Sequence, residues 1–233
     1  MRSIEQIPKE DYMKYFEEFN PVDFDPRKWA KAAKEAGMKY MVLTAKHHDG
    51  FCLFDSQYTD FKSTNTKCGR DLVAEYVDAV RTEGLKVGLY FSLLDWFHDD
   101  FPHYGDRNHP MRNNPAYKND DRDFDRYLTY MHNQVREICT NYGKLDVLWF
   151  DFSYDTLRGE AWKATELIKM VRKLQPDVII DNRLEVRKSD PVPRRLCEPG
   201  ADDSAEWHPG CEWKRYRLGI LRYDEQSLGL LCQ

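Results

Sequence analysis

The chain contains the stretch Leu145-Asp146-Val147-Leu148-Trp149-Phe150-Asp151, a mostly apolar run that ends abruptly in a carboxylate. A parallel strand that is buried on both faces has this nearly continuous hydrophobic character. The pattern recurs where Met41-Val42-Leu43-Thr44-Ala45 leads into Lys46-His47-His48-Asp49, and where Val178-Ile179-Ile180 leads into Asp181-Asn182-Arg183. Ionisable residues at the carboxyl ends of several parallel strands are typical of the catalytic rim of an α/β barrel. The repeated pattern therefore predicts an enzyme.

The composition narrows the class of ligand. Hydrophobic residues make up 41% and aromatic residues 14% of the 233 residues, which excludes a disordered chain and provides a substantial core. The 40 acidic residues outnumber the 35 basic ones, and the net charge of -5 argues against nucleic acid, whose phosphates require a basic face. Acidic clefts that are rich in aromatic residues more often bind neutral ligands such as sugars.

Targeting and cysteine signals are weak. Met1-Arg2-Ser3-Ile4-Glu5 lacks the apolar core of a signal peptide, and no run approaches the roughly 18 apolar residues of a membrane span. The six cysteines lie at positions 52, 68, 139, 197, 211 and 232. They form no CxxC pair and have no metal-ligand spacing with histidine. We therefore expect a cytoplasmic protein with reduced thiols, no membrane contact, no metal and no cofactor.

Helix and strand signals alternate along the chain after an opening loop. The expected helices cover 26–36, 69–83, 123–142 and 160–174, and the expected strands cover 39–45, 86–92, 145–151 and 177–181. Asp25 is a good N-cap for the first helix, and Gly37 ends it. The alternation predicts a parallel sheet of βαβ units. A doubly wound fold would tend to have a Gly-rich phosphate loop after its first strand, and the sequence contains none. We expect a partial (β/α)8 TIM-type barrel with four strands in residues 1–186, followed by an irregular tail in residues 187–233.

His47 and His48 have two interpretations. A single histidine after a strand more often satisfies a backbone group than binds a ligand. Adjacent residues in a regular strand point to opposite faces, so both imidazoles can face one ligand only if the strand has already ended. Asp49-Gly50 favours such an end, and hydrogen bonds to sugar hydroxyls are then the better functional role.

Asp151 also has a structural alternative, as a helix cap or an ion-pair partner. Trp149 lies two residues earlier and therefore faces the same side of the strand. An aromatic face beside a carboxylate suits a pyranose, and a nearby arginine such as Arg183 would keep the carboxylate ionised for nucleophilic catalysis. The loop from Trp96 to Asp121 is better interpreted as part of the rim, although Trp96 itself is a candidate for lining the cleft.

Several of these stretches together resemble glycoside hydrolase family 29 α-L-fucosidases over about residues 5 to 186. The resemblance is carried in order by residues 38–51, Thr59-Asp60-Phe61, Gly69-Arg70-Asp71-Leu72-Val73, residues 84–92 and residues 145–151. It implies retaining hydrolysis through a fucosyl-enzyme intermediate, with Asp151 as the nucleophile. It also implies five substrate-binding residues, which are His47, His48, Tyr90, Trp149 and Arg183.

The chain departs from this family at both ends. The family's first strand, with its His-Trp-Gly motif, is absent, and nothing after Val186 resembles the family's acid/base region. Read one base forward, the codons for residues 198–205 and 222–233 can encode strings that resemble the family's downstream motifs, which predicts a frameshifted tail. The family's general acid/base would then fall near Gly200, leaving Glu185 and Glu198 as the nearby carboxylates.

Three readings follow from this pattern. The leading one is an α-L-fucosidase that acts on fucosylated oligosaccharides or glycoconjugates and is impaired in this chain. The second is a fucose-binding fragment without catalysis, and the third is a product without function. The exposed strand edges of a partial barrel also predict self-association.

Overall fold

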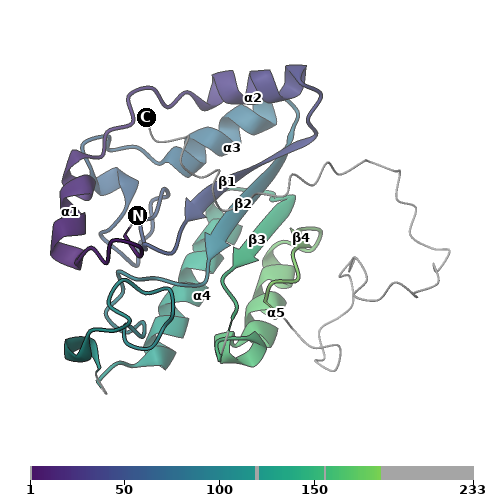
Figure 1. Ribbon diagram of the computed structural model, residues 1–233. Coiled ribbons are helices and arrows are strands. Elements are labelled where there is room, and N and C mark those ends of the chain that lie inside the picture. The colour runs from purple at the N-terminus through teal and green to yellow at the C-terminus, as the bar shows by residue number, and fades with distance from the viewer. Residues whose placement is uncertain (1, 119–120, 155, 185–233) are drawn as a thin grey trace. The chain divides into compact units, whose positions relative to one another are not determined.

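The computed structural model describes residues 2–118, 121–154 and 156–184 (Figure 1). The irregular tail that we expect at 187–233 lies outside the described residues, as do the two alternative carboxylates Glu185 and Glu198. Within the described part of the chain, no helix combines the length and the hydrophobicity that crossing a membrane requires.

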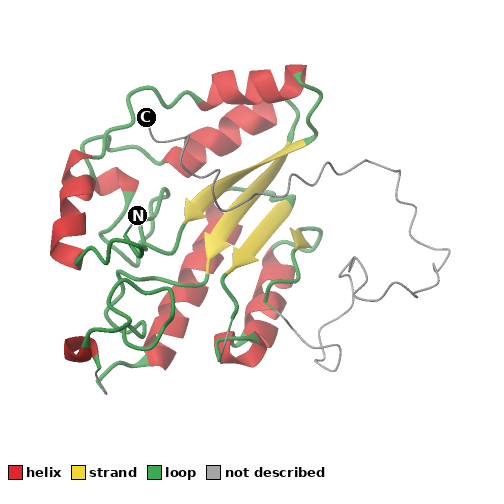
Figure 2. Ribbon diagram, viewed as in Figure 1, coloured by secondary structure: helices red, strands yellow, loops and turns green. Residues whose placement is uncertain are grey.

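Helices and strands alternate as the sequence predicts (Figure 2). The strands are β1 (Tyr40–Lys46), β2 (Lys86–Ser92), β3 (Val147–Asp151) and β4 (Ile179–Ile180). The helices are α1 (Lys9–Glu18), α2 (Pro26–Glu35), α3 (Leu72–Thr82), α4 (Phe124–Asn141) and α5 (Ala164–Leu174). The strands form one parallel sheet in the order β1-β2-β3-β4, so consecutive strands are neighbours, as in successive units of a (β/α)8 barrel.

Aspartate caps fix where the helices begin. Asp25, the expected N-cap, accepts a hydrogen bond from the Lys28 amide, and Asp71 caps α3 in the same way through the Ala74 amide. Asp123 caps α4 through the Arg126 amide at 3.0 Å. These caps fix the first residue of α2, α3 and α4.

Three elements differ from the expectation. Helix α1 forms where an opening loop was expected. The sequence did not indicate this helix, because none of its residues is buried and it therefore leaves no hydrophobic stripe. Phe16 and Phe19 instead contact Phe51. The expected helix at 160–174 is a short 3-10 turn at Gly159–Trp162 and then α5, separated by Lys163 at φ 50°. Strand β4 has only two residues, shorter than the expected 177–181.

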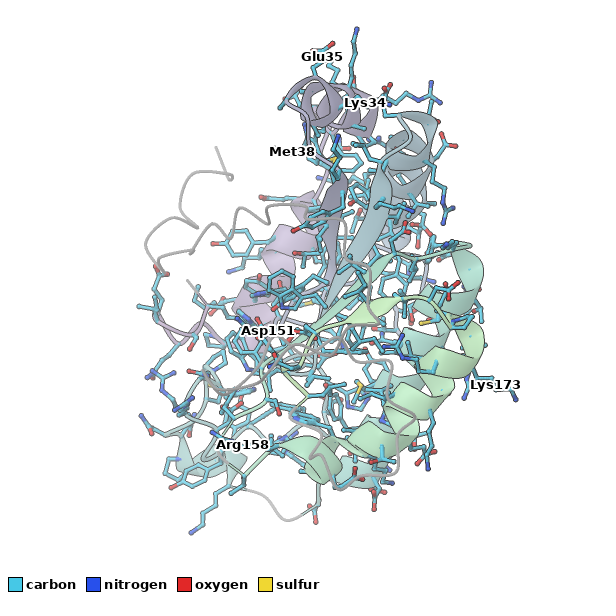
Figure 3. The ribbon with its side chains drawn as sticks, turned by 90° about the vertical axis from the view of Figure 1, so that its right-hand side faces the viewer. Lys34, Glu35, Met38, Asp151, Arg158 and Lys173 are labelled. Carbon is cyan, nitrogen blue, oxygen red and sulfur yellow. The ribbon has the colours of Figure 1, made fainter. Side chains whose placement is uncertain are left out.

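The two faces of the sheet differ in what covers them. Leu89, Phe91, Leu148 and Phe150 are fully buried on the face against which the helices pack. Figures 1 and 3 show α4 and α5 on the same side of the strands. On the opposite face the residues Tyr40, Trp149 and Ile179 are 41%, 38% and 53% exposed. The open face is therefore lined with large apolar groups, and it leads to the carboxyl ends of the strands, where Asp151 lies (Figure 3).

Candidate active site

A bulge at the end of β1 prepares the histidine pair. Thr44 pairs with Tyr90, whereas Lys46 pairs with Phe91, so Ala45 is an extra residue in β1. Bulges of this kind bend a strand and redirect the side chains that follow.

The strand ends at Lys46, and His47 and His48 lie beyond it with ring centroids 3.8 Å apart. This agrees with the prediction that the two imidazoles meet only if the strand has ended.

Burial keeps both imidazoles uncharged. It lowers the pKa of His47, and it lowers the pKa of His48 to about 2. The His47 ring stacks on Tyr90 with centroids 5.6 Å apart, so the pair contacts β2 at the level of its last residues. A neutral imidazole has one donor and one acceptor nitrogen, which matches a sugar hydroxyl that both donates and accepts.

Asp151 is oriented by donors from three directions. The Tyr90 hydroxyl donates to Oδ2 at 2.9 Å, and the Phe152 amide donates to Oδ1 at 2.9 Å. Arg183 forms an ion pair with Oδ1 through Nη1. The Asp151 side chain nevertheless remains 19% exposed. The carboxylate therefore has a fixed orientation together with access for a ligand.

Arg183 and Trp149 extend this arrangement on the open face. The Arg183 guanidinium carbon lies 5.8 Å from the centre of the Trp149 ring, within the range of a cation–π contact. Trp149 faces the same side as Asp151, as the strand alternation predicts. The structure thus brings together all six residues that the sequence singled out: His47, His48, Tyr90, Trp149, Asp151 and Arg183.

Phe152 is a site residue that the sequence did not indicate. It adopts φ 71°, which is rare for a residue with a side chain and which turns the chain sharply after Asp151. Its ring meets those of His47 and His48 edge-on, with centroids 5.6 and 5.2 Å away. Backbone strain of this kind occurs preferentially at functional sites.

Asp181 is a second carboxyl group at the site; the sequence places it at a strand end but indicates no individual role for it. Its Oδ1 accepts a hydrogen bond from the Phe150 amide at 3.0 Å, and its Oδ2 is buried without a partner. Burial raises the pKa of Asp181 to about 7, and the nearby charge of Asp151 contributes in the same direction. Its position directly after the apolar run was the available signal.

Trp96 lies behind the histidines instead of lining the cleft. It is buried, its ring centroid is 3.9 Å from that of His48, and its amide donates to the His48 carbonyl at 2.8 Å. The loop that begins at Trp96 therefore packs against the histidine pair, and Trp96, the candidate for lining the cleft, is buried against His48.

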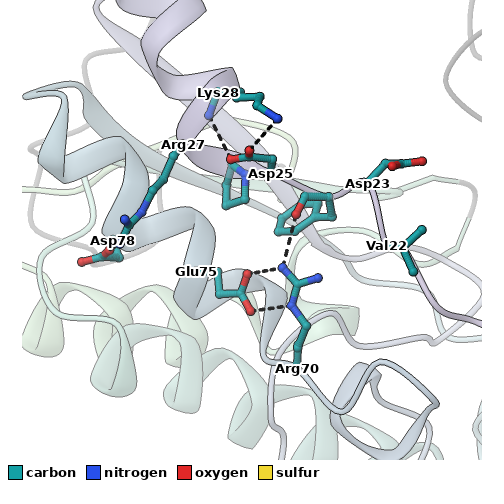
Figure 4. Close-up of a pocket in the computed structure, with 10 residues that line it drawn as sticks. Val22, Asp23, Asp25, Arg27, Lys28, Arg70, Glu75 and Asp78 are labelled. Carbon is teal, nitrogen blue, oxygen red and sulfur yellow. Dashed lines mark hydrogen bonds and ion pairs between the residues drawn. The ribbon is translucent and has the colours of Figure 1, made fainter.

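A groove of about 560 Å³ lies elsewhere, between the first turns of α2 and α3 (Figure 4). Its charged side chains pair with one another: Arg70 with Glu75, Lys28 with Asp25, and Arg27 with Asp78 at 3.6 Å. None of the site residues lines it. The groove is therefore a mixed-charge surface feature separate from the cluster around Asp151.

Comparisons with known proteins agree with the geometry. The sequence profile of the family described as "Alpha-L-fucosidase" matches residues 4–205. Alpha-L-fucosidase 1 of Arabidopsis thaliana is 32% identical over 170 residues, which are 70% of this chain and 29% of that protein. Tissue alpha-L-fucosidase of Mus musculus is 41% identical over 92 residues, which are 39% of this chain and 20% of that protein.

Solved structures give the same family. Alpha-L-fucosidase isoenzyme 1 from Paenibacillus thiaminolyticus is 67% identical with a TM-score of 0.78, over 78% of this chain and 44% of that one. The Lactobacillus casei enzyme AlfC, in complex with its α-L-fucose product, is 32% identical with a TM-score of 0.69. The match covers 79% of this chain and 59% of that one. The chain spans between 28% and 36% of the length of the first curated relatives that it matches.

Proposed function

The chain belongs to the α-L-fucosidase family, and from this membership we propose that it binds terminal α-L-fucosyl groups of glycans and hydrolyses their linkage with Asp151 as the nucleophile. The observation that carries the proposal is the convergence of Tyr90 and Arg183 on the Asp151 carboxylate. A carboxylate fixed in this way at the end of a strand is arranged for attack on an anomeric carbon.

In the proposed reaction, Asp151 forms a bond to the anomeric carbon while the glycosidic C–O bond breaks and the leaving oxygen takes a proton from solvent water. A second water molecule then attacks the anomeric carbon of the fucosyl ester and gives up one proton to solvent, which releases fucose with retained configuration and returns the carboxylate. Trp149 offers a flat apolar surface to the sugar ring, and His47 and His48 offer nitrogens to its hydroxyls. Arg183 balances the negative charge of Asp151.

We propose that this activity is slow in this chain. Retaining hydrolysis uses a second carboxyl group that protonates the leaving oxygen. Among the described residues, Asp181 is close to Asp151 and burial raises its pKa to about 7, but its Oδ2 is buried, so we infer that Asp181 does not supply this proton. General acid catalysis typically contributes a factor of about 10² to 10⁴, so turnover without it is lower by about that factor.

Replacing Asp151 by Asn separates the leading proposal from the alternative, a fucose-binding fragment without catalysis. Hydrolysis of an aryl α-L-fucoside, whose good leaving group needs little protonation, should be measurable in the original chain and absent in Asp151→Asn. Fucose affinity, measured by titration calorimetry, should persist in the variant. Equal hydrolysis by the two proteins would disprove the nucleophile, and binding without any hydrolysis in either would favour the alternative.

The open face of the sheet supports a further proposal, that the chain associates with itself. Tyr40, Trp149 and Ile179 expose apolar area on one face of a sheet whose edge strands β1 and β4 have no further neighbour among the described residues. Such a surface favours association because burying it removes apolar area from water. Light scattering over a range of concentrations should give a mass above that of one chain, and a constant monomer mass would rule the proposal out.

A further inference from the structure

A buried ion pair lies directly behind the histidine pair. Lys46 is fully buried and Asp95 is 1% exposed, with Nζ and Oδ2 3.2 Å apart. The ammonium group also donates to Gln134 Oε1 at 3.0 Å and lies over the rings of Phe91 and Tyr130. A charged amine with this many partners in the core is unusual, since burying an ammonium group carries a large desolvation penalty.

The partners of Asp95 are equally complete. Its Oδ1 accepts hydrogen bonds from the amides of Phe97 and His98, each at 3.0 Å, and the Tyr130 hydroxyl donates to Oδ2 at 3.2 Å. Replacing a buried ion pair by neutral groups of similar volume is often neutral or stabilising, so stability alone does not account for such a pair. What the pair specifies is the conformation of the loops that carry it.

Each member of the pair precedes a ring of the site. Lys46 comes directly before His47-His48, and Asp95 comes directly before Trp96, whose ring lies 3.9 Å from that of His48. The Trp96 amide also donates to the His48 carbonyl.

Gly50, in the loop after β1, also lies against Asp95. A Cβ atom added at Gly50 would lie 2.2 Å from Asp95 Oδ1, so the loop after β1 rests directly on this carboxylate.

We propose that Lys46 and Asp95 are positioning residues, whose ion pair locks the loop after β1 to the loop after β2 and thereby holds His48 against Trp96 and His47 in the site. The positioning itself is a property of this chain's own structure. Only its consequence for sugar affinity rests on the proposed function.

The test uses the full chain and the neutral double variant K46M/D95N, which keeps the side-chain oxygen that caps the two amides. Gln175→Met is the matched control, because Gln175 is also buried and holds three backbone groups, but at the amino end of β3. The readout is the NMR spectrum of histidines labelled with ¹³C in the ring. In the original chain the Trp96 ring current displaces the His48 signals from their usual position.

We expect K46M/D95N to unfold cooperatively at a temperature no lower than Gln175→Met, yet to lose the displacement of the His48 signals. Gln175→Met should keep it. A double variant that retains the His48 signals at their original positions would overturn the proposal. Should it fail to fold, hydrogen exchange of the Trp96 amide in the original chain decides: exchange only through global unfolding supports the lock, and rapid local exchange contradicts it.

Fucose titrations separate this inference from the proposed function. We expect the affinity for α-L-fucose to fall at least about tenfold in K46M/D95N and to stay unchanged in Gln175→Met. If the original chain does not bind fucose, the proposed function fails, while the His48 signals still decide whether the pair positions the ring.

Discussion

Replacing Asp181 by Asn should stabilise the protein by an amount that grows with pH. Asn keeps an oxygen that can accept the hydrogen bond from the Phe150 amide, but it cannot ionise. The pKa of Asp181 is raised from 3.8 to about 7 by burial, so the folded state keeps a proton that the unfolded state releases above pH 3.8. A raised carboxyl pKa therefore makes the free energy of unfolding fall as pH rises from about 4 to about 7.

The magnitude follows from the size of the shift. A difference of about 3 pKa units, at about 1.4 kcal/mol per unit, gives an upper limit of about 4 kcal/mol. The Asn side chain of Asp181→Asn cannot ionise, so the variant does not lose this part of its free energy of unfolding as pH rises. The free energy of unfolding of the variant minus that of the original chain should therefore increase between about pH 4 and about pH 7 and stay constant above.

Urea unfolding at pH values between about 5 and 8, followed by tryptophan fluorescence, provides the measurement. The difference between the two proteins is used because buried His48 and His109, each with a pKa of about 2, destabilise both proteins as the pH falls below 6.5. Asp177→Asn, at an exposed aspartate before β4, controls for the loss of one carboxyl group. A difference for Asp181→Asn that does not change with pH would show that the pKa of Asp181 is not raised in the folded protein.

Three further outcomes are expected. Gly50→Ala should lower the melting temperature, measured by circular dichroism, more than Gly37→Ala does. Both glycines have a positive φ, which costs about 1–2 kcal/mol for alanine, but only at Gly50 would the added Cβ press against Asp95. Equal losses in the two variants would contradict this prediction. The His48 imidazole should remain neutral in NMR spectra at about pH 5, because burial lowers its pKa to about 2; a midpoint near 6.5 would show that it is exposed. Trp149→Ala should weaken fucose binding about tenfold in calorimetry with little change in unfolding, and unchanged affinity would exclude stacking on this ring.

The ends of β1 and β3 were predictable because their apolar runs stop at charged residues. Helices α2, α3 and α4 were predictable from the aspartates that begin them, from the glycines that follow them and from apolar residues at helical spacing. These local signals depend only on neighbours in the sequence. Helix α1 lacked them, since it buries none of its residues and packs through aromatic contacts that the sequence does not reveal.

The supporting groups of the site could not be predicted for the same reason. Lys46 and Asp95 are 49 residues apart, and nothing local to either indicates that they meet. The left-handed backbone of Phe152 could not be predicted, because the position carries neither the glycine nor the asparagine that usually marks such a conformation. Trp96 was recognised as a candidate, but its burial behind His48 depends on how two loops pack. The proposed site residues at the strand ends were thus easier to predict from the sequence than the groups that pack behind them.

The proposed function places fucose where β1, β2 and β3 end, around Asp151. Titrating the ¹⁵N-labelled chain with α-L-fucose and mapping the amide chemical shift changes locates the sugar. We expect changes at residues 47–50, 90–92 and 149–152, and none in the groove between α2 and α3. Changes confined to that groove, or no changes up to a concentration at which fucose saturates an intact α-L-fucosidase, would contradict it.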